Sequence, residues 1–346
     1  MKDNNNVPGA LLNGSPLHPS LLQRTMLVAI VGFVSLGLTA WHITTTETLL
    51  LVNDRVFRHH QYGMHVAKAS ASVASSPLST IPRLIHQSWK TADAIPSKFA
   101  PWMQSWRALN PTWHYIFWND VDNLQLFQTY FPEYYPMATQ LSKISLADMA
   151  RYAMLYHYGG VYADADFECL QSFDDLIDRD LFLSFEPLVH SVLLEGATQP
   201  VLCNAILASR PKHPFWLHVL QQIKHRFETN PDRDPVSLTG PRIVKAAIAT
   251  VDVVKMNISL LPEEYFYPEI AYWNLGNLQS HCGMPEALDA TKRACSWLQK
   301  YPKGRRTAKT HAVHHWQHTW GMGDRATSYV SLNEIFPRDD VWQPTF

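Results

Sequence analysis

Two aspartates separated by a single residue, Asp164 and Asp166, are the side chains of this sequence best suited to metal chemistry. In an extended backbone, residues i and i+2 point to the same side, so we expect the two carboxylates to project together. Neighbouring carboxylates repel one another, and a divalent cation bound by both removes that repulsion. Because carboxylate and diphosphate oxygens suit Mg²⁺ and Mn²⁺, the pair predicts a cation that bridges the protein to a diphosphate.

The surroundings of this pair favour a partly buried site over a solvated turn. The segment 158–166 reads YGGVYADAD and places apolar and aromatic residues beside the two acids. Gly159 and Gly160 allow the chain to turn sharply as it enters the segment. An EF-hand calcium loop is excluded, because the further ligands and the terminal glutamate that it requires are missing.

A second polar pair, Asp148 and Arg151, lies a short distance upstream. At a spacing of three residues the two side chains share one face of a helix. One interpretation is a surface ion pair of little energetic consequence. The other is a polar pair at the edge of a sheet that reaches a sugar or a phosphate. The residues by themselves leave both interpretations open.

Strand and helix patterns alternate in the part of the chain that must position these side chains. We expect strands at 81–89, 113–118 and 161–167, and helices at 101–109, 120–130 and 144–158. Ser145 is the predicted cap of the last of these helices, and Gly159 is its predicted end. Further along we expect strands at 181–185 and 253–261, and helices at 200–209 and 214–227.

This order of elements predicts an α/β fold with a mostly parallel sheet. In such sheets ligands bind beyond the carboxyl ends of the strands. The segment 161–167 is expected at such an end, which places the two aspartates where a ligand would bind.

Composition narrows the function classes and the chemistry of the cysteines. The 346 residues carry a formal net charge of −1, so the chain lacks the basic field that binds nucleic acid. None of the four cysteines forms a C-x-x-C pair, which argues against a structural zinc site. Cys282 and Cys295 flank a short stretch, and they either close a disulfide in an oxidising compartment or remain free thiols.

The N-terminal part predicts a membrane anchor. Residues 25–41 carry no charged side chain and come close to the length of a bilayer span. We expect a cytoplasmic tail at 1–24, a transmembrane signal-anchor at 25–43, a flexible stem at 44–80 and a compact domain at 81–346. A cleaved signal peptide is the alternative, but the apolar run is long for one and ends in Trp41.

Taken together, these motifs resemble glycosyltransferase family 32. The resemblance is carried by Ala147-Asp148-x-x-Arg151-Tyr152, by Tyr158-Gly159-Gly160 and by Asp164-x-Asp166. The segment 81–89, Asn204, Thr239-Gly240-Pro241 and His314-His315-Trp316 are also similar to elements of that family. The family includes fungal Golgi α-1,6-mannosyltransferases and catalytic subunits of inositol-phosphoceramide mannosyltransferases.

The resemblance implies a GT-A fold, a nucleotide-sugar donor and a metal-dependent transfer with retention at the sugar. Asp148, Arg151, Asp164 and Asp166 would be catalytic. Asp164, Asp166 and His314 would hold Mn²⁺ or Mg²⁺, although His315 and a purely structural histidine remain alternatives to His314. The residues implied to bind the nucleotide-sugar are Ile85, His86, Gln87, Trp89, Asp148, Arg151, Tyr152, Gly160 and Asp164.

The family layout further implies a Golgi type II membrane protein, held by one N-terminal helix, with a lumenal catalytic domain. The sequon Asn257-Ile258-Ser259 agrees with lumenal exposure. The expected reaction moves a hexose, with mannose from GDP-mannose leading, to a glycan or glycolipid acceptor. A metal-dependent phosphoester or nucleotide-sugar hydrolase and an inactive sugar-binding relative are the alternatives. Glu186 and Asp174 are unassigned carboxylates and are candidates for acceptor-side groups.

Overall fold

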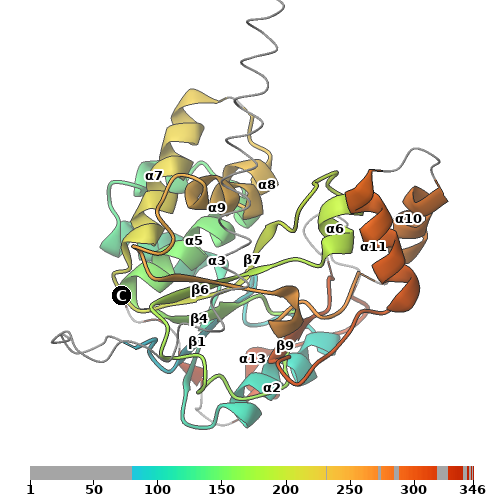
Figure 1. The fold of residues 1–346 in the computed structure, drawn as a ribbon. Coiled ribbons are helices and arrows are strands. Elements are labelled where there is room, and N and C mark those ends of the chain that lie inside the picture. Colours follow the sequence, from blue (N-terminus) through green and yellow to red (C-terminus); the bar gives the residue numbers. More distant parts are fainter. Residues whose placement is uncertain are drawn as a thin grey trace, which may run out of the picture. The chain divides into compact units, whose positions relative to one another are not determined.

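The computed structural model describes residues 80–230, 232–271, 274–283, 288–317, 326–337, 341–342, 344 and 346 (Figure 1). The predicted cytoplasmic tail, signal-anchor and nearly all of the stem lie outside these residues. Within them, no helix combines the length and the apolar character that a bilayer span requires.

A seven-stranded sheet forms the centre of the described domain, in the order β11-β3-β1-β4-β7-β6-β8. Its strands are β1 (Leu84–Ser88), β3 (His114–Trp118), β4 (Gly160–Ala163), β6 (Leu181–Phe185), β7 (Leu202–Ser209), β8 (Ile258–Leu261) and β11 (Val341–Trp342). Strand β7 runs antiparallel to both of its neighbours, and every other pairing in the sheet is parallel. The predicted α/β fold with a mostly parallel sheet is therefore confirmed.

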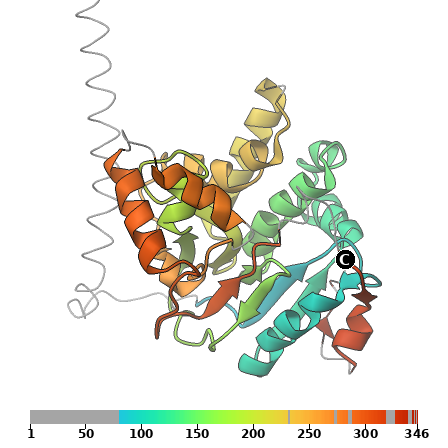
Figure 2. The ribbon, with the colours of Figure 1, turned by 90° about the vertical axis from the view of Figure 1, so that its right-hand side faces the viewer.

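Helices cover both faces of this sheet, as Figures 1 and 2 show. One face packs against α3 (Asp120–Tyr130), α5 (Lys143–His157), α7 (Pro214–Thr229) and α9 (Pro241–Ile248). The other face packs against α2 (Ala100–Leu109) and α13 (Leu332–Ile335). Strand β1 serves both cores because its side chains alternate: Ile85 lies in the second core, and His86 packs its ring near Trp118 on the first.

Smaller elements complete the domain. Two-stranded sheets join β2 (Ile95–Pro96) to β10 (Tyr329–Val330) and β5 (Phe167–Cys169) to β9 (Ala312–His314). A third core packs α6 (Leu188–Leu193) against α10 (Leu275–Ser280) and α11 (Asp289–Lys300). Further short helices in the described residues are α4 (Tyr135–Ala138) and α8 (Pro235–Leu238). Short 3₁₀ helices lie at Ser97–Phe99, Glu263–Tyr265 and His281–Gly283.

The predicted helices at 101–109, 120–130 and 214–227 and the predicted strands at 113–118 and 181–185 are confirmed within a residue or two. Two predicted strands are longer than the observed ones, since β1 begins at Leu84 and β8 begins at Ile258. Hydrogen-bonded turns occupy the residues before β8, for example from the Met256 N–H to the Asp252 carbonyl at 3.0 Å.

Three predictions are wrong in instructive ways. The expected helix at 200–209 is strand β7, and all eight of its residues are buried between two other strands. A buried strand and a buried helix segment present the same continuous apolar run, so periodicity could not separate them. The cap of α5 is Ser142, whose hydroxyl accepts from the Ser145 N–H, while Ser145 itself lies in the first turn.

The third correction concerns the motif itself. The expected continuous strand at 161–167 is broken into β4 and β5 by a turn at Asp164–Asp166, which the Phe167 N–H closes by donating to the Asp164 carbonyl at 3.0 Å. The two aspartates therefore do not alternate along one strand. Gly159, with φ +69°, ends α5 as predicted.

The cysteines divide into a bonded and a free pair. Cys282 and Cys295 form a disulfide that joins the end of α10 to α11, so the first of the two interpretations is confirmed. Cys169 and Cys203 are free and buried. The disulfide covalently links two segments of the third core.

Candidate functional site

The Asp164–Asp166 turn lies at the carboxyl end of β4, where the sheet order places a ligand site. Neighbouring strands hold its backbone on both sides. The Asp164 N–H donates to the Ala205 carbonyl at 2.8 Å, and the Gln87 side-chain amide donates to the Asp164 carbonyl at 3.0 Å. The turn is thus anchored to β7 and β1, which keeps both carboxylates at one edge of the sheet.

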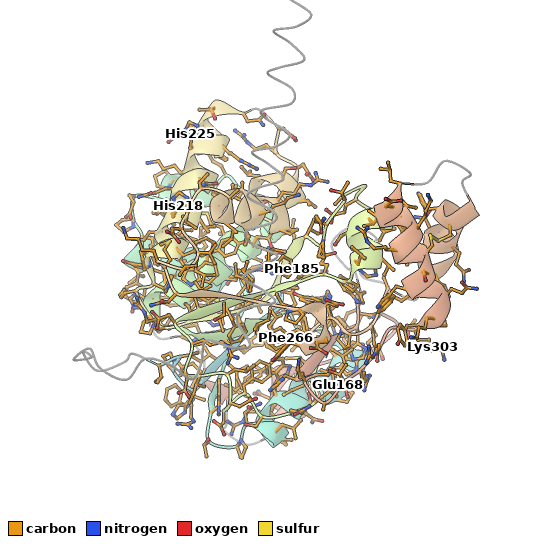
Figure 3. The ribbon with its side chains drawn as sticks, viewed as in Figure 1. Glu168, Phe185, His218, His225, Phe266 and Lys303 are labelled. Atoms are coloured by element: carbon orange, nitrogen blue, oxygen red, sulfur yellow. A yellow bond between two sulfur atoms is a disulfide. The ribbon has the colours of Figure 1, made fainter. Side chains whose placement is uncertain are left out.

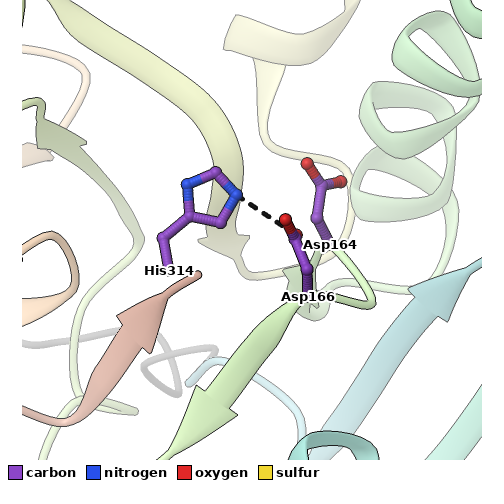
Figure 4. A group of neighbouring side chains, drawn as sticks. All are labelled: Asp164, Asp166 and His314. Carbon is purple, nitrogen blue, oxygen red and sulfur yellow. Dashed lines mark hydrogen bonds and ion pairs between the residues drawn. The ribbon is translucent and has the colours of Figure 1, made fainter. Parts of the chain in front are cut away.

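A third metal-ligand side chain, His314, completes a cluster with the two aspartates (Figure 4). Strand β9 supplies it by pairing with β5, and this pairing sets His314 opposite Phe167. One ligand atom from each of the three residues lies within 4.8 Å of the others. His314 Nε2 is 3.1 Å from Asp166 Oδ1.

The chemistry of this cluster fits a divalent cation. Two carboxylates and one imidazole are donors that protein metal sites use for such ions. His314 Nδ1 is buried and has no hydrogen-bond partner in the part of the chain that the structure describes. Burial opposes ionisation of Asp166, but the imidazole of His314 and the Gln317 N–H together hold the pKa of its carboxyl below the usual value. Asp166 is therefore ready to bind a cation as a carboxylate.

The two adjacent histidines have different partners. His315 Nε2 lies 3.1 Å from Glu168 Oε2, and the His315 ring stacks on Trp102 with 3.8 Å between ring centroids. The imidazole of His314 instead faces Asp166. Of the two candidates in the sequence, His314 is the one that points into the cluster.

Arg151 joins the helix pair to the turn. Its guanidinium lies 3.0 Å from Asp148 Oδ1 and 3.1 Å from Asp164 Oδ1, and it donates to the Asn204 carbonyl at 2.7 Å. The side chains of Arg151 and Asp148 are 4% and 9% exposed, so a surface ion pair is excluded. Arg151 brings fixed positive charge to the side of Asp164.

Asp148 is held by neutral donors as well as by Arg151. The Asn204 amide donates to its Oδ1 at 2.9 Å and the Thr239 hydroxyl donates to its Oδ2 at 3.2 Å. Burial raises the pKa of Asp148 to about 6, against the opposing effect of Arg151. With a partner at each oxygen, Asp148 positions Arg151 in this structure.

Asp164 receives a further hydrogen bond that the sequence analysis did not identify. The Tyr162 hydroxyl donates to Asp164 Oδ1 at 2.7 Å, and the Arg151 guanidinium lies over the Tyr162 ring at 4.6 Å. Tyr162 is two residues before Asp164, so its side chain is on the same face, and that alternation was available as a signal. Asn204 carried no comparable local signal beyond the family resemblance.

Three residues expected to bind the nucleotide-sugar, Ile85, His86 and Gln87, are buried, and Gln87 contacts the Asp164–Asp166 turn. His86 is fully buried and uses both ring nitrogens, one toward the Gly159 carbonyl at 2.9 Å and one toward the Trp118 indole N–H at 3.1 Å. Burial lowers its pKa to about 4. Ile85 lies in the core, and Gln87 accepts from the Tyr115 hydroxyl at 2.6 Å.

Tyr152, Gly160 and Trp89, which were also expected to bind the nucleotide-sugar, differ in accessibility. Tyr152 is buried and donates to the Thr239 carbonyl at 2.7 Å. Gly160 has φ +99°, and a Cβ at this position would lie 2.7 Å from the Leu84 carbonyl oxygen. Glycine there permits β4 to approach β1 closely. Trp89 follows the carboxyl end of β1 and is partly exposed, so it retains a position from which to contact a base.

Part of the chain is similar to a known protein family. Residues 96–183, which contain the turn, match the family described as "Glycosyltransferase sugar-binding region containing DXD motif". The resemblance to family 32 is thereby confirmed.

Two of the curated proteins that this chain resembles come from yeasts. Inositol phosphoceramide mannosyltransferase 1 of Schizosaccharomyces pombe is 33% identical over 165 residues, which is 45% of this chain and 48% of that protein. Mannosyl phosphorylinositol ceramide synthase CSH1 of Saccharomyces cerevisiae is 33% identical over 156 residues, which is 43% of this chain and 37% of that protein. The matched region thus spans less than half the length of either relative.

The chain also resembles solved glycosyltransferase structures. The PaToxG glycosyltransferase aligns with a TM-score of 0.41 and 14% identity, over 67% of this chain and 83% of that chain.

Proposed function

We propose that this protein is a metal-dependent, retaining glycosyltransferase of GT-A fold, which transfers a hexose from a nucleotide-sugar to a glycan or glycolipid. The observation that carries the proposal is the Asp164–Asp166–His314 cluster, with the buried guanidinium of Arg151 beside it. Mannose from GDP-mannose is the leading donor, because the curated relatives are named as mannosyltransferases.

The proposed reaction breaks the bond between the anomeric carbon of the donor and its diphosphate. Negative charge builds on the leaving oxygen, and a cation such as Mn²⁺ or Mg²⁺ held by the cluster supplies Lewis-acid stabilisation there. Arg151 contributes fixed positive potential that needs no reorganisation during the reaction, because Asp148 and Asn204 hold it in place. Asp164 is oriented by Arg151 and Tyr162, and Asp166 by His314 and the Gln317 N–H.

Two observations support a Golgi location with the catalytic domain in the lumen, anchored by residues 25–43. A disulfide joins Cys282 and Cys295, and disulfides persist in oxidising compartments. The sequon asparagine Asn257 is exposed, as an N-glycosylation acceptor must be.

The test is a panel of nucleotide-sugars supplied to the full-length protein with Mn²⁺, scored for released nucleotide with and without an acceptor. Octyl α-mannoside and vesicles that contain inositol phosphoceramide represent the two acceptor classes. A transferase releases nucleotide slowly until an acceptor is added. Full consumption of donor without acceptor indicates the hydrolase, and donor binding without turnover indicates an inactive relative.

A single substitution tests the cluster. Asp166→Ala is expected to abolish donor turnover while the far-ultraviolet circular dichroism spectrum stays unchanged. Turnover comparable with that of the wild type in saturating Mn²⁺ would refute the role of Asp166.

A further inference from the structure

Strands β6 and β7 continue past the point at which β4 ends. In the sheet register Ala163, the last residue of β4, pairs with Ile206, while β7 begins four residues earlier at Leu202. The far end of β6 pairs with this extension, since Ser184 lies opposite Cys203 and Phe185 opposite Leu202. Figure 3 labels Phe185 at this end of the sheet, on the side of α6. The extension therefore projects alongside the metal cluster.

Glu186 is the first residue after β6 and lies at the tip of this extension. Its N–H donates to the Val201 carbonyl at 2.8 Å, which continues the pairing of β6 with β7 by one residue. Its side chain is buried and shares a hydrogen bond with the Cys203 thiol. Burial and then the Glu195 carboxylate raise the pKa of Glu186, and the hydrogen bond with Cys203 lowers it. Within the described part of the chain, no basic side chain forms an ion pair with it. A buried carboxyl without a cationic partner calls for an explanation.

The sheet fixes how far this carboxyl is from the proposed donor site. Strands β4, β7 and β6 are consecutive, so Glu186 is two strand spacings from Asp164. At about 4.8 Å each, the lateral separation is roughly 10 Å. Along the strands Glu186 is displaced further, since the Asp164 N–H bonds the Ala205 carbonyl of β7 and the Glu186 N–H bonds the Val201 carbonyl just before β7. Both negative charges also act on Tyr267, whose hydroxyl pKa is raised first by burial and then by Cys203, Glu186 and Asp164.

Aromatic side chains connect the cluster to this tip. The Tyr267 ring lies 5.8 Å from the His314 ring and 5.6 Å from the Trp316 ring, measured between centroids. Trp316 in turn lies 4.3 Å from His314 and 4.5 Å from His190, a residue of α6, which begins two residues after Glu186. Tyr267 and His190 are buried, whereas Trp316 is partly exposed and offers an aromatic face that suits the C–H groups of a sugar ring.

The second unassigned carboxylate of the sequence has a different environment. Asp174 is half exposed, pairs with Arg83 at 3.0 Å and accepts from the Trp113 indole N–H at 3.0 Å. Its partners are all accounted for at the surface. Asp174 is therefore the less suited of the two candidates to bind an acceptor.

We propose that Glu186 is an acceptor-binding residue, which hydrogen-bonds a hydroxyl of the incoming acceptor on the far side of the donor sugar from the metal cluster. This inference rests on the proposed function, because it requires a transfer reaction with an acceptor. The recognised chemistry is a polyhydroxylated ring, whether it belongs to a glycan or to a lipid headgroup.

The test compares Glu186→Ala, Glu186→Gln and the surface control Asp174→Asn in the full-length protein. Initial rates are measured with the donor that the nucleotide-sugar panel identifies and with octyl α-mannoside as the acceptor probe. We expect Glu186→Ala to raise the acceptor KM by about 10-fold or more, since a buried hydrogen bond to substrate is lost. The donor KM is expected to stay within about twofold of wild type, because ground-state donor contacts are unchanged. Glu186→Gln keeps the shape and a hydrogen-bonding group, and it is expected to recover most of the acceptor KM.

An unchanged acceptor KM in Glu186→Ala overturns the inference, as does an equal rise in donor and acceptor KM, which indicates a structural role. If the alanine variant does not fold, Glu186→Asp withdraws the carboxyl by one methylene and must still raise the acceptor KM. Asp174→Asn must leave both constants at the wild-type value. Absence of nucleotide release by the wild type with every donor is a different result, because it refutes the proposed function itself.

Discussion

Arg151 and Asp164 form a buried ion pair in which guanidinium Nη1 lies 3.1 Å from carboxylate Oδ1. Helix α5 contributes the cation and the turn after β4 contributes the anion. Asp148 binds the other guanidinium nitrogen at 3.0 Å, so Arg151 couples the helix to the Asp164–Asp166 turn. The pair thus places a permanent positive charge beside a carboxylate that is proposed to face the donor diphosphate.

Replacement of Arg151 by lysine is expected to lower kcat by about 100-fold, because a lysine ammonium cannot reproduce the planar fork between two carboxylates. Arg151→Ala is expected to destabilise the fold by about 3–5 kcal/mol, since two buried carboxylates lose their cation. Steady-state rates and urea unfolding measure the two effects. The control is Arg210→Lys, at a partly exposed pair with Asp180. A kcat for Arg151→Lys near that of Arg210→Lys would contradict this role.

The adjacent histidines provide a matched pair for the metal site. His314→Ala removes a cluster side chain and is expected to weaken Mn²⁺ binding by about 10-fold or more. His315→Ala removes a ring that stacks on Trp102 and pairs with Glu168, and it is expected to leave Mn²⁺ affinity unchanged. Titration calorimetry with Mn²⁺ alone measures both. Equal losses in the two variants would show that His314 is not a ligand.

Gly160 is expected to tolerate no side chain. A Cβ there would meet the Leu84 carbonyl oxygen at 2.7 Å on a backbone with φ +99°. We expect Gly160→Ala to lower the free energy of unfolding by more than about 1 kcal/mol, from left-handed strain and from overpacking between β4 and β1. Gly276→Ala is the control, because a Cβ in α10 would meet no atom within 4 Å. That variant should be as stable as wild type or more stable, owing to the higher helix propensity of alanine. Thermal unfolding of the two variants tests the difference.

The buried carboxyl of Glu186 is expected to make the free energy of unfolding depend on pH. Burial, followed by the nearby Glu195 charge, raises its pKa from 4.5 to about 8. The folded state therefore binds this proton more tightly than the unfolded state. The free energy of unfolding consequently falls as pH rises from about 4.5 to about 8, by up to about 1.4 kcal/mol per pH unit from this group.

Glu186→Gln removes that dependence, so the stability of the variant relative to wild type should increase between about pH 5 and about pH 8. Cys203 and Tyr267 also act on or near Glu186, and burial is the largest cause that raises their pKa values well above the usual ranges, so these two groups do not titrate in this window. Urea unfolding of both proteins at several pH values measures the difference. A constant difference across the window would mean that Glu186 is ionised throughout in the folded protein.

Much of the fold could be predicted because the signals are local. The 3.6-residue pattern of 120–130 and its cap at Asn119 are decided within one element. Strand β7 could not be predicted in the same way. Its apolar run reads equally well as a buried helix, and only its place between β4 and β6 makes it extended. Partner strands supply the backbone hydrogen bonds that a helix would otherwise make within itself.

Some features of the candidate site could likewise be predicted from local sequence, and others depended on how distant strands pair. The proximity of Asp164 and Asp166 was predicted, but for the wrong reason, since a turn and not strand alternation brings them together. His314 is 148 residues from Asp166 in sequence. The register of β9 against β5 decides that His314, and not His315, faces the cluster. A shift of that register by one residue would turn the other side chain toward the cluster.

The amino-acid sequence by itself determined an α/β chain with an Asp-x-Asp motif, a nearby Asp148–Arg151 pair and a family resemblance, because each is encoded over a short stretch. Tertiary structure alone decided which side chains are buried together: Arg151 between two carboxylates, Asn204 and Thr239 around Asp148, and Glu186 at the tip of β6. The physical reason is that burial and charge pairing are properties of the packed sheet. They depend on strands that are far apart in the chain and adjacent in space.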